Sequence, residues 1–338
     1  MDETPDTGSG GGSPDATPAV GISRQARIAR IFVAMPPELV LVVVLVILGF
    51  IFWQGSEFFL TTRNMRNVLL SVSVLGILAA PGTLLLISGN FDLSVASGAA
   101  LCGCIAGVVA EENSAAAAIL AALGVGLLAG IFNGVLSAYA GIASIVVTLG
   151  TWLGYRGLAR LFSNGQTIRM NGKVEFITND IFGVPAQIVM FVLITVLAWF
   201  VVRYTRFGRS VYAIGSNPTA ARLSGIRQKP TIFVMFIVSG LLAGLAGLIL
   251  ASQLDAASGN AATGVELEVV AAIILGGASL SGGRGTIPGT VLGVFILGIM
   301  QNGLTLLSIS SFWQDVATGV VLVAAVGLDQ VRLRLSGS

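Results

Sequence analysis

The sequence predicts an all-α polytopic membrane protein, and three observations lead to this prediction. Charged residues make up only 10% of the 338 residues, whereas 55% are hydrophobic and the mean hydropathy is +0.92. Because an ordinary soluble chain is about a quarter charged, these charges are too few to coat a soluble surface. The apolar residues form about ten runs, most near the ~20 residues that a bilayer-spanning helix needs. The basic residues cluster in the loops between these runs.

The predicted spans follow one another along nearly the whole chain. They occupy residues 36–54, 67–88, 93–110, 115–139, 143–163, 185–203, 230–252, 265–280, 286–307 and 312–329. The second contains Pro81-Gly82, and the eighth is short and interrupted by glycine. We therefore expect both to be broken or re-entrant helices, which a membrane protein tolerates where they line a cavity.

Two tails flank the predicted membrane domain, which we place at residues 36–330. Residues 1–35 are predicted to form a disordered cytoplasmic tail, because the first 23 are rich in Gly, Ser, Pro, Thr and Asp. They do not resemble a signal peptide, since no basic stretch is followed directly by an apolar one. Residues 331–338 are expected to form a short cytoplasmic tail.

Positive charge sets the predicted orientation, because basic loops stay on the cytoplasmic side of a membrane. Residues 203–229, between the sixth and seventh segments, hold six basic residues and no acidic residue. Three arginines precede the first segment, and two follow the last. An even number of spans places all three regions on one side. We therefore expect both termini in the cytoplasm.

An internal repeat relates the two halves of the chain. Residues 123–150 align without gaps to residues 292–319, with eight of 28 positions identical, and Asn133-Gly134 falls on Asn302-Gly303. Segment four thus maps onto segment nine, and an offset of five spans reverses direction across the bilayer. Such an inverted-topology repeat builds a transport path with its site near the midplane. The alternative is chance agreement between sequences rich in Gly, Leu and Val.

A short helix is predicted inside the basic loop, at residues 218–224. Asn217 is a good N-cap, Pro218 suits the first helical turn, and Gly225 suits the left-handed residue that ends a helix. Because so short a helix is not stable alone, it must pack on something. One interpretation is an ordinary structured loop or a site for anionic lipid headgroups. The other is a docking helix for a cytoplasmic partner.

Five ordered motifs resemble those of ribose-type sugar permeases in the ATP-binding-cassette importer superfamily, over roughly residues 38–330. NPTAARLSGI resembles the Glu-Ala-Ala-type cytoplasmic loop of these permeases, with Thr219 where many carry Glu. The other four are SGNFDLSVASG, IVVTLGTWLGYRGLA, FGRSVYAIGSN and ELEVVAAIILGGASLSGGRGTIPGTVLG. Asn90-Phe91 replaces a small and aliphatic pair, and Glu268 stands where Asp is frequent. These departures leave the predicted fold unchanged but leave the substrate open.

The resemblance implies the fold and the partners. It implies a vitamin B12-importer-like permease fold of about ten transmembrane helices in two inverted five-helix repeats. It also implies a homo- or heterodimer of permeases, two ATPase subunits and an extracytoplasmic sugar-binding protein. The substrate class is a monosaccharide: ribose, another pentose, a deoxyhexose or a related furanosyl compound. Transport is expected to proceed by ATP-driven alternating access.

The chain itself is not expected to be an enzyme. The phosphate-loop pattern G-x-x-x-x-G-K-[ST] is missing, and Lys173 and Lys229 are the only lysines, so ATP must be hydrolysed by a separate subunit. The sequence has no histidine, and its two cysteines, Cys102 and Cys104, are interpreted as small packed residues. We therefore expect no catalytic residue, no metal site and no bound cofactor.

The candidate site residues fall into three groups. The resemblance implies that residues 204–229 form the coupling loop. It also implies that the ATPase-coupling helix in this loop comprises Asn217, Pro218, Thr219, Ala220, Ala221, Arg222, Leu223, Ser224 and Gly225. Amide and acidic side chains in or beside the spans are candidates for the substrate path: Asn90, Asp92, Asn133, Gln301 and Asn302. Asp255 and Glu266 are candidates for contact with the binding protein.

Each of these assignments has a structural alternative. Asp92 also suits the cap of the third span. The asparagines also suit hydrogen bonds between helices. Glu266 also suits a helix N-terminus, where the dipole favours a carboxylate. Arg156 and Arg160, one helical turn apart, are expected either to extend to the interface or to pair with an acidic residue.

Two other functions remain open from the sequence. A branched-chain amino-acid permease of the same superfamily shares the general architecture, but the sugar-permease motifs match better. An ion-coupled secondary transporter needs an acidic residue in mid-span, and only Asp92, Glu268 and Asp315 come near such a position. A membrane-embedded enzyme fits least, because no nucleophile and base pair is visible.

Overall fold

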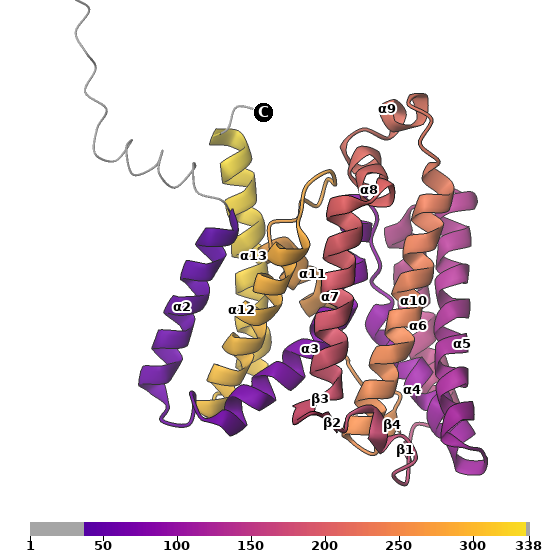
Figure 1. Cartoon of the computed structure of the whole chain (residues 1–338), viewed down its shortest axis with the longest axis vertical. Helices are drawn as coiled ribbons and strands as arrows, with labels where there is room; N and C mark the ends of the chain where they lie inside the picture. The colour runs from indigo at the N-terminus through magenta and orange to yellow at the C-terminus, as the bar shows by residue number, and fades with distance from the viewer. Residues whose placement is uncertain (1–36, 336–338) are drawn as a thin grey trace, which may run out of the picture. The chain divides into compact units, whose positions relative to one another are not determined.

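The computed structural model describes residues 37–335 and is built almost entirely from α-helices (Figure 1). The tail predicted at residues 1–35 lies outside the described residues. The long helices are α2 (Pro37–Gly55), α3 (Thr62–Ile87), α4 (Val95–Glu112), α5 (Ala115–Gly134), α6 (Ser144–Phe162), α7 (Ala186–Tyr204), α10 (Gln228–Gln253), α12 (Ile287–Leu306) and α13 (Ser311–Leu335).

Shorter elements complete the chain between these helices. They are the π-helix η1 (Val135–Tyr139), the 3-10 helix η2 (Glu175–Ile177), the helices α8 (Arg206–Ser216), α9 (Pro218–Leu223) and α11 (Val265–Leu275), and the strands β1 (Thr167–Arg169), β2 (Asp180–Ile181), β3 (Val184–Pro185) and β4 (Ala256–Ser258). The strands form two antiparallel pairs. Thr167 lies opposite Ser258 in β1–β4, and Asp180 lies opposite Pro185 in β2–β3.

Seven helices in the described part of the chain are long and apolar enough to cross a membrane: α2, α3, α4, α5 with η1, α7, α10 and α12. This confirms the prediction of an all-α, multi-pass membrane protein. The other three predicted spans coincide with α6, α11 and α13. α6 carries two arginines, α11 has only 11 residues, and the apolar part of α13 is confined to residues 311–324.

The predicted break at Pro81-Gly82 is wrong, because α3 continues through both residues. Proline removes one backbone donor from a helix, and in a membrane helix neighbouring helices and Ser or Thr side chains stabilise the backbone around it. Here the Thr83 hydroxyl lies 2.7 Å from the carbonyl oxygen of Ala79 and 2.8 Å from the hydroxyl of Thr290 in α12. Tight packing therefore outweighs the local preference of Pro81.

α11 is short, as the sequence predicted for the eighth segment. Its 11 residues span about 16 Å at 1.5 Å per residue, about half the ~30 Å hydrocarbon core of a bilayer. A non-helical segment, residues 259–264, precedes it. It ends at Gly276, and Gly277 has a φ of +88° that favours glycine.

Glycines allow α10 to pack closely on α5 and α4. A Cβ atom at Gly240 would lie 2.2 Å from the carbonyl oxygen of Gly126 in α5. A Cβ atom at Gly247 would lie 2.2 Å from the carbonyl oxygen of Ala99 in α4. The glycine-rich run at residues 240–250 therefore forms a helix-packing surface. Cys102 and Cys104 lie in the same buried core, as expected for small packed residues.

The packing of the first half has a counterpart in the second half. α4 packs on α5 and α6, and correspondingly α11 packs on α12 and α13. α10 from the second half packs on α4 and α5, whereas α3 from the first half packs on α11 and α12. α3 and α10 also contact each other. If each helix is replaced by its counterpart in the other half of the chain, the same pairs of helices are thus in contact.

The loops gather at two opposite ends of the helices. Figure 1 shows α8 and α9 at one end and the four strands at the other. Glu38 at the start of α2 accepts a hydrogen bond from Thr286, and this contact lies at the end with α8. At the other end, Lys173 donates hydrogen bonds to carbonyl oxygens near the end of α4, including that of Asn113 at 3.2 Å. We call these the α9 end and the strand end.

Candidate functional site

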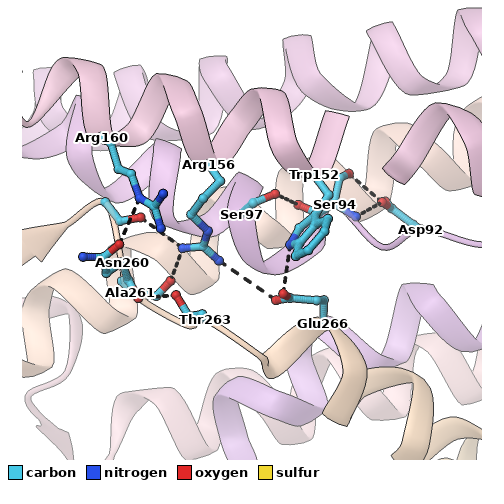
Figure 2. A network of polar contacts seen from close by, with 11 residues as sticks. Asp92, Ser94, Ser97, Trp152, Arg156, Arg160, Asn260, Ala261, Thr263 and Glu266 are labelled. Carbon is cyan, nitrogen blue, oxygen red and sulfur yellow. Dashed lines mark hydrogen bonds and ion pairs between the residues drawn. The ribbon is translucent and has the colours of Figure 1, made fainter. Parts of the chain in front are cut away.

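A buried polar cluster joins α6 to the segment that leads into α11 (Figure 2). Among the residues that the structure describes, Asp92, Arg156 and Glu266 are the charged residues that are buried. A buried charge is costly unless it is paired and hydrogen-bonded, so the partners of these three residues define the site.

Arg156 binds the non-helical backbone before α11. Trp152, Arg156 and Arg160 follow one another at intervals of four residues, so they share one face of α6. Nη1 of Arg156 donates to the carbonyl oxygens of Gly259, at 3.1 Å, and Ala261, at 2.6 Å. Nε of Arg160 donates to Oδ1 of Asn260 at 3.0 Å. Carbonyl groups outside a helix need such donors when they are buried.

Glu266, in the first turn of α11, faces this row of α6 side chains. Its Oε1 accepts a hydrogen bond from Nε1 of Trp152 at 2.8 Å. Its Oε2 lies 4.0 Å from Nη2 of Arg156. Of the two expectations for Arg156, pairing with an acidic residue therefore holds. Only 4% of Glu266 is exposed and its carboxylate faces α6, so its contact with a binding protein stays a prediction.

Asp92 lies in the non-helical segment between α3 and α4 and accepts three hydrogen bonds. Oδ1 accepts from the backbone N–H of Ser94 at 3.0 Å and from its hydroxyl at 2.6 Å. Oδ2 accepts from the hydroxyl of Ser239 in α10 at 2.7 Å. Asp92 therefore holds the start of α4 against α10, although the N-cap of this helix is Ser94 and not Asp92.

The two repeat-related asparagines take different partners. Asn133 in α5 is buried, and its Nδ2 donates to the hydroxyl of Ser94 at 2.8 Å. Asn302 in α12 forms a reciprocal amide pair with Asn64 in α3, with both distances 2.8 Å. Each asparagine therefore joins its helix to a neighbour, the arrangement that the alternative interpretation describes.

The remaining predicted residues lie outside this cluster. Nδ2 of Asn90 donates to the Ser88 hydroxyl at 3.1 Å, and Gln301 is half-buried in α12. Asp255 is exposed at the strand end, where its Oδ1 accepts from the backbone N–H of Gly172 at 2.8 Å. Sequence reasoning missed Trp152, although its spacing from Arg156 was a usable signal.

The short helix predicted at residues 218–224 is present as α9. Oδ1 of Asn217 accepts from the backbone N–H of Ala220 at 2.9 Å, Pro218 occupies the first turn, and Gly225 has a φ of +80°. Ala221 is buried, whereas Leu223 is 81% exposed. α9 is therefore anchored on one side and presents an apolar side chain on the other.

α8 connects α9 to the membrane helices, and the sequence did not predict it. Val211 and Ile214 on one side of α8 are buried. A Cβ atom at Gly215 would lie 1.8 Å from the carbonyl oxygen of Ile87, the last residue of α3, and 2.6 Å from the backbone nitrogen of Gly283. α8 thus contacts both α3 and the loop at residues 276–286, and no space for a side chain is left at Gly215.

A tyrosine on α8 also holds this loop. The Tyr212 hydroxyl donates to the carbonyl oxygen of Gly285 at 2.6 Å. Burial raises the pKa of Tyr212 above its usual value near 10, so this hydroxyl keeps its proton at neutral pH. The glycine-rich sequence at residues 279–285 is therefore a turn that packs on α8.

Comparison with known proteins gives the same result as the sequence motifs. A family model described as "Branched-chain amino acid transport system / permease component" matches residues 64–326. The ribose import permease protein RbsC of Escherichia coli (strain K12) is 37% identical over 302 residues, covering 86% of this chain and 93% of that protein. RbsC of Bacillus subtilis (strain 168) is 37% identical over 284 residues, covering 81% and 87%. The xylose transport system permease protein XylH of Escherichia coli (strain K12) is 30% identical, covering 87% and 91%.

Proposed function

Because this chain belongs to the family of branched-chain amino acid transport system permease components, we propose that it is the membrane subunit of an ATP-binding-cassette importer for a monosaccharide. The match to ribose permeases carries this proposal, since it covers 86% of this chain and 93% of the Escherichia coli relative. The xylose permease adds a second pentose. Ribose, another pentose, a deoxyhexose or a related furanosyl compound is therefore the proposed substrate.

The proposed architecture is ten spans in two inverted five-helix repeats, within residues 36–330, in a vitamin B12-importer-like fold. The matching helix contacts of the two halves support this architecture, since α4 packs on α5, α6 and α10, and α11 packs on their counterparts α12, α13 and α3. The α9 end is proposed to face the cytoplasm, with both termini, because six basic residues cluster there. The protein is assigned to the bacterial inner membrane.

The residues exposed at the two ends of the helices indicate the proposed partners. This chain is proposed to catalyse no reaction. Two ATPase subunits are proposed to hydrolyse the ATP that drives transport. α9, residues 217–225 with its caps, is proposed to dock on them, because Leu223 is exposed beside basic residues. The strand end is proposed to meet a sugar-binding protein around the exposed Asp255. A second copy or a related permease completes the membrane unit.

The proposed substrate path runs along the polar residues between the two halves. Asn90, Asp92, Asn133, Gln301 and Asn302 are its proposed lining. Asp92 and Asn133 share Ser94 as a partner, and Asn302 pairs with Asn64. In the alternating-access cycle these bonds between helices must exchange for bonds to sugar hydroxyls, which supply the same donor and acceptor chemistry.

Uptake by the reconstituted importer tests the substrate class. Proteoliposomes containing this chain with its ATPase subunits receive the binding protein outside, ATP inside, and radiolabelled D-ribose, D-xylose or L-leucine. We expect accumulation of at least one pentose and none of leucine. Accumulation of leucine alone contradicts the proposal and favours a branched-chain amino-acid permease, the substrate class that the family description names.

A pair of exposed leucines tests the role of α9. Leu223 is 81% exposed on α9, and Leu254 is 70% exposed after α10, at the strand end. We expect Leu223→Asp to prevent co-purification of the ATPase subunits, because a charge replaces the apolar contact. Leu254→Asp is expected to leave co-purification unchanged. Equal binding by both variants contradicts the docking of ATPase subunits on α9.

A further inference from the structure

Two charged atoms in the α6–α11 cluster have no hydrogen-bond partner among the described residues. They are Nη2 of Arg156 and Oε2 of Glu266, although Nη1 of Arg156 and Oε1 of Glu266 are both hydrogen-bonded. Their side chains are only 9% and 5% exposed. Buried charged atoms nearly always have a partner, so one further hydrogen-bonding group is expected between these two atoms.

The distance between the two atoms defines the missing group. At 4.0 Å they are too far apart for a direct hydrogen bond, which needs 2.7–3.2 Å. A single oxygen about 2.8 Å from each atom fits between them. A hydroxyl oxygen accepts from Nη2 while its proton goes to Oε2, so one O–H group satisfies both.

The opposite charges of the pair favour a neutral ligand. A cation placed between the two atoms is attracted by Glu266 but repelled by Arg156, and an anion is attracted by Arg156 but repelled by Glu266, so neither gains from both groups. A neutral hydroxyl meets neither penalty. Trp152 lies beside the pair and is held by Glu266, so an aromatic ring adjoins the hydroxyl position (Figure 2). Charged groups with an adjacent aromatic ring suit a compound that carries several hydroxyls on an apolar ring.

We propose that Arg156 and Glu266 together bind one hydroxyl of the transported sugar, with Trp152 beside its ring. This inference rests on the proposed function, which supplies the sugar. The cluster holds the segment at residues 259–264, which directly follows β4 at the strand end.

Tryptophan emission reports on the subsite directly. The chain has four tryptophans, so changing Trp53, Trp199 and Trp313 to Phe leaves Trp152 as the only one. This full-length variant, in lipid nanodiscs, is titrated with D-ribose, D-xylose and L-leucine. We expect a saturable change in emission with a pentose and none with leucine. The same variant, assembled with its partners, is first checked for pentose uptake.

Glu266→Gln tests the carboxylate within the same assay. A hydrogen bond to a charged group is stronger than one to a neutral group, so we expect half-saturation to need at least ~10 times more pentose. Glu112→Gln, an exposed carboxylate at the end of α4 and outside the cluster, is the control and is expected to leave half-saturation unchanged.

Deoxy sugars separate hydroxyl binding from a purely structural role. With Glu266 intact, one of the 2-, 3- and 5-deoxy analogues of D-ribose is expected to bind roughly tenfold more weakly than D-ribose. This difference is expected to vanish in Glu266→Gln. The first result of this experiment needs no change at Glu266, so it holds even if Glu266→Gln does not fold.

Two results overturn this inference and leave the proposed function intact. One is pentose uptake without any change in Trp152 emission. The other is equal binding of D-ribose and all three deoxy analogues by the chain with Glu266 intact. Uptake of leucine without uptake of pentose instead overturns the proposed function.

Discussion

A single methyl group at Gly126 tests the packing on which the arrangement of the helices depends. α5 offers its own control, because Gly126 and Gly124 lie two residues apart on the same helix. A Cβ atom at Gly126 would lie 2.3 Å from the carbonyl oxygen of Gly240 in α10, whereas a Cβ atom at Gly124 has nothing within 4 Å. Gly126→Ala and Gly124→Ala therefore differ in whether the added methyl group meets the backbone of α10.

The structure sets the size of the expected difference. Ordinary contacts begin at 3.4 Å, so α5 and α10 must separate by about 1 Å to admit the methyl group of Gly126→Ala. Overpacking of this kind costs roughly 1–3 kcal/mol. Both variants gain up to ~1 kcal/mol from the better helix propensity of alanine, so this gain cancels in the comparison.

Thermal unfolding, followed by tryptophan emission in detergent, measures this difference. One kcal/mol shifts the midpoint of a large domain by about 2–4 °C. We expect Gly126→Ala to unfold several degrees below Gly124→Ala. Gly240→Ala should behave like Gly126→Ala, because its Cβ atom would lie 2.2 Å from the carbonyl oxygen of Gly126. If Gly126→Ala unfolds at or above the temperature of Gly124→Ala, the packing argument is refuted.

Three further predictions concern polar contacts and the α9 end. Asn64→Ala and Asn302→Ala should each lower the free energy of unfolding by about 1–3 kcal/mol. The double variant should lower it by less than the sum of the two single effects, because both residues belong to one amide pair. Fully additive effects would contradict a hydrogen bond between the two side chains. Gly215→Ala should reduce uptake severalfold with the ATPase subunits still bound, because its methyl group would lie 1.8 Å from the carbonyl oxygen of Ile87; normal uptake contradicts close contact between α8 and α3. Tyr212→Phe should lower stability by about 1 kcal/mol at neutral pH. Burial raises the pKa of Tyr212, so its hydroxyl loses its proton at a lower pH in the unfolded chain than in the folded chain. The stabilisation by Tyr212 should therefore hold below pH ~10 and decline above it. A decline that begins near pH 7 would contradict a raised pKa.

The positions of the helices were predictable from the sequence because a bilayer demands long apolar runs. Each predicted span coincides with a helix, and α9 has the caps that Asn217 and Gly225 indicated. Local rules failed where tertiary packing decided the outcome. Pro81 suggested a break, but a buried helix surrounded by partners continues through it. α8 was missed because its arginines suggested a loop, whereas Val211 and Ile214 bury one side.

The site was less predictable, because its contacts join residues that are distant in the sequence. The pattern of α6 placed Arg156 on a polar face, but no local rule connects it to the backbone of Gly259 or to Glu266. Likewise, the repeat related Asn133 to Asn302, yet their partners Ser94 and Asn64 come from other helices. Residue type indicated which groups need a partner, and only the fold supplied the partner.

The ATP dependence of pentose uptake tests the central proposal most directly. Proteoliposomes with the assembled importer are given the binding protein and labelled D-ribose or D-xylose, with ionophores that collapse proton and sodium gradients. We expect at least one pentose to accumulate with internal ATP, and no accumulation with a non-hydrolysable analogue. Accumulation that needs an ion gradient and no ATP would contradict the account and identify an ion-coupled transporter.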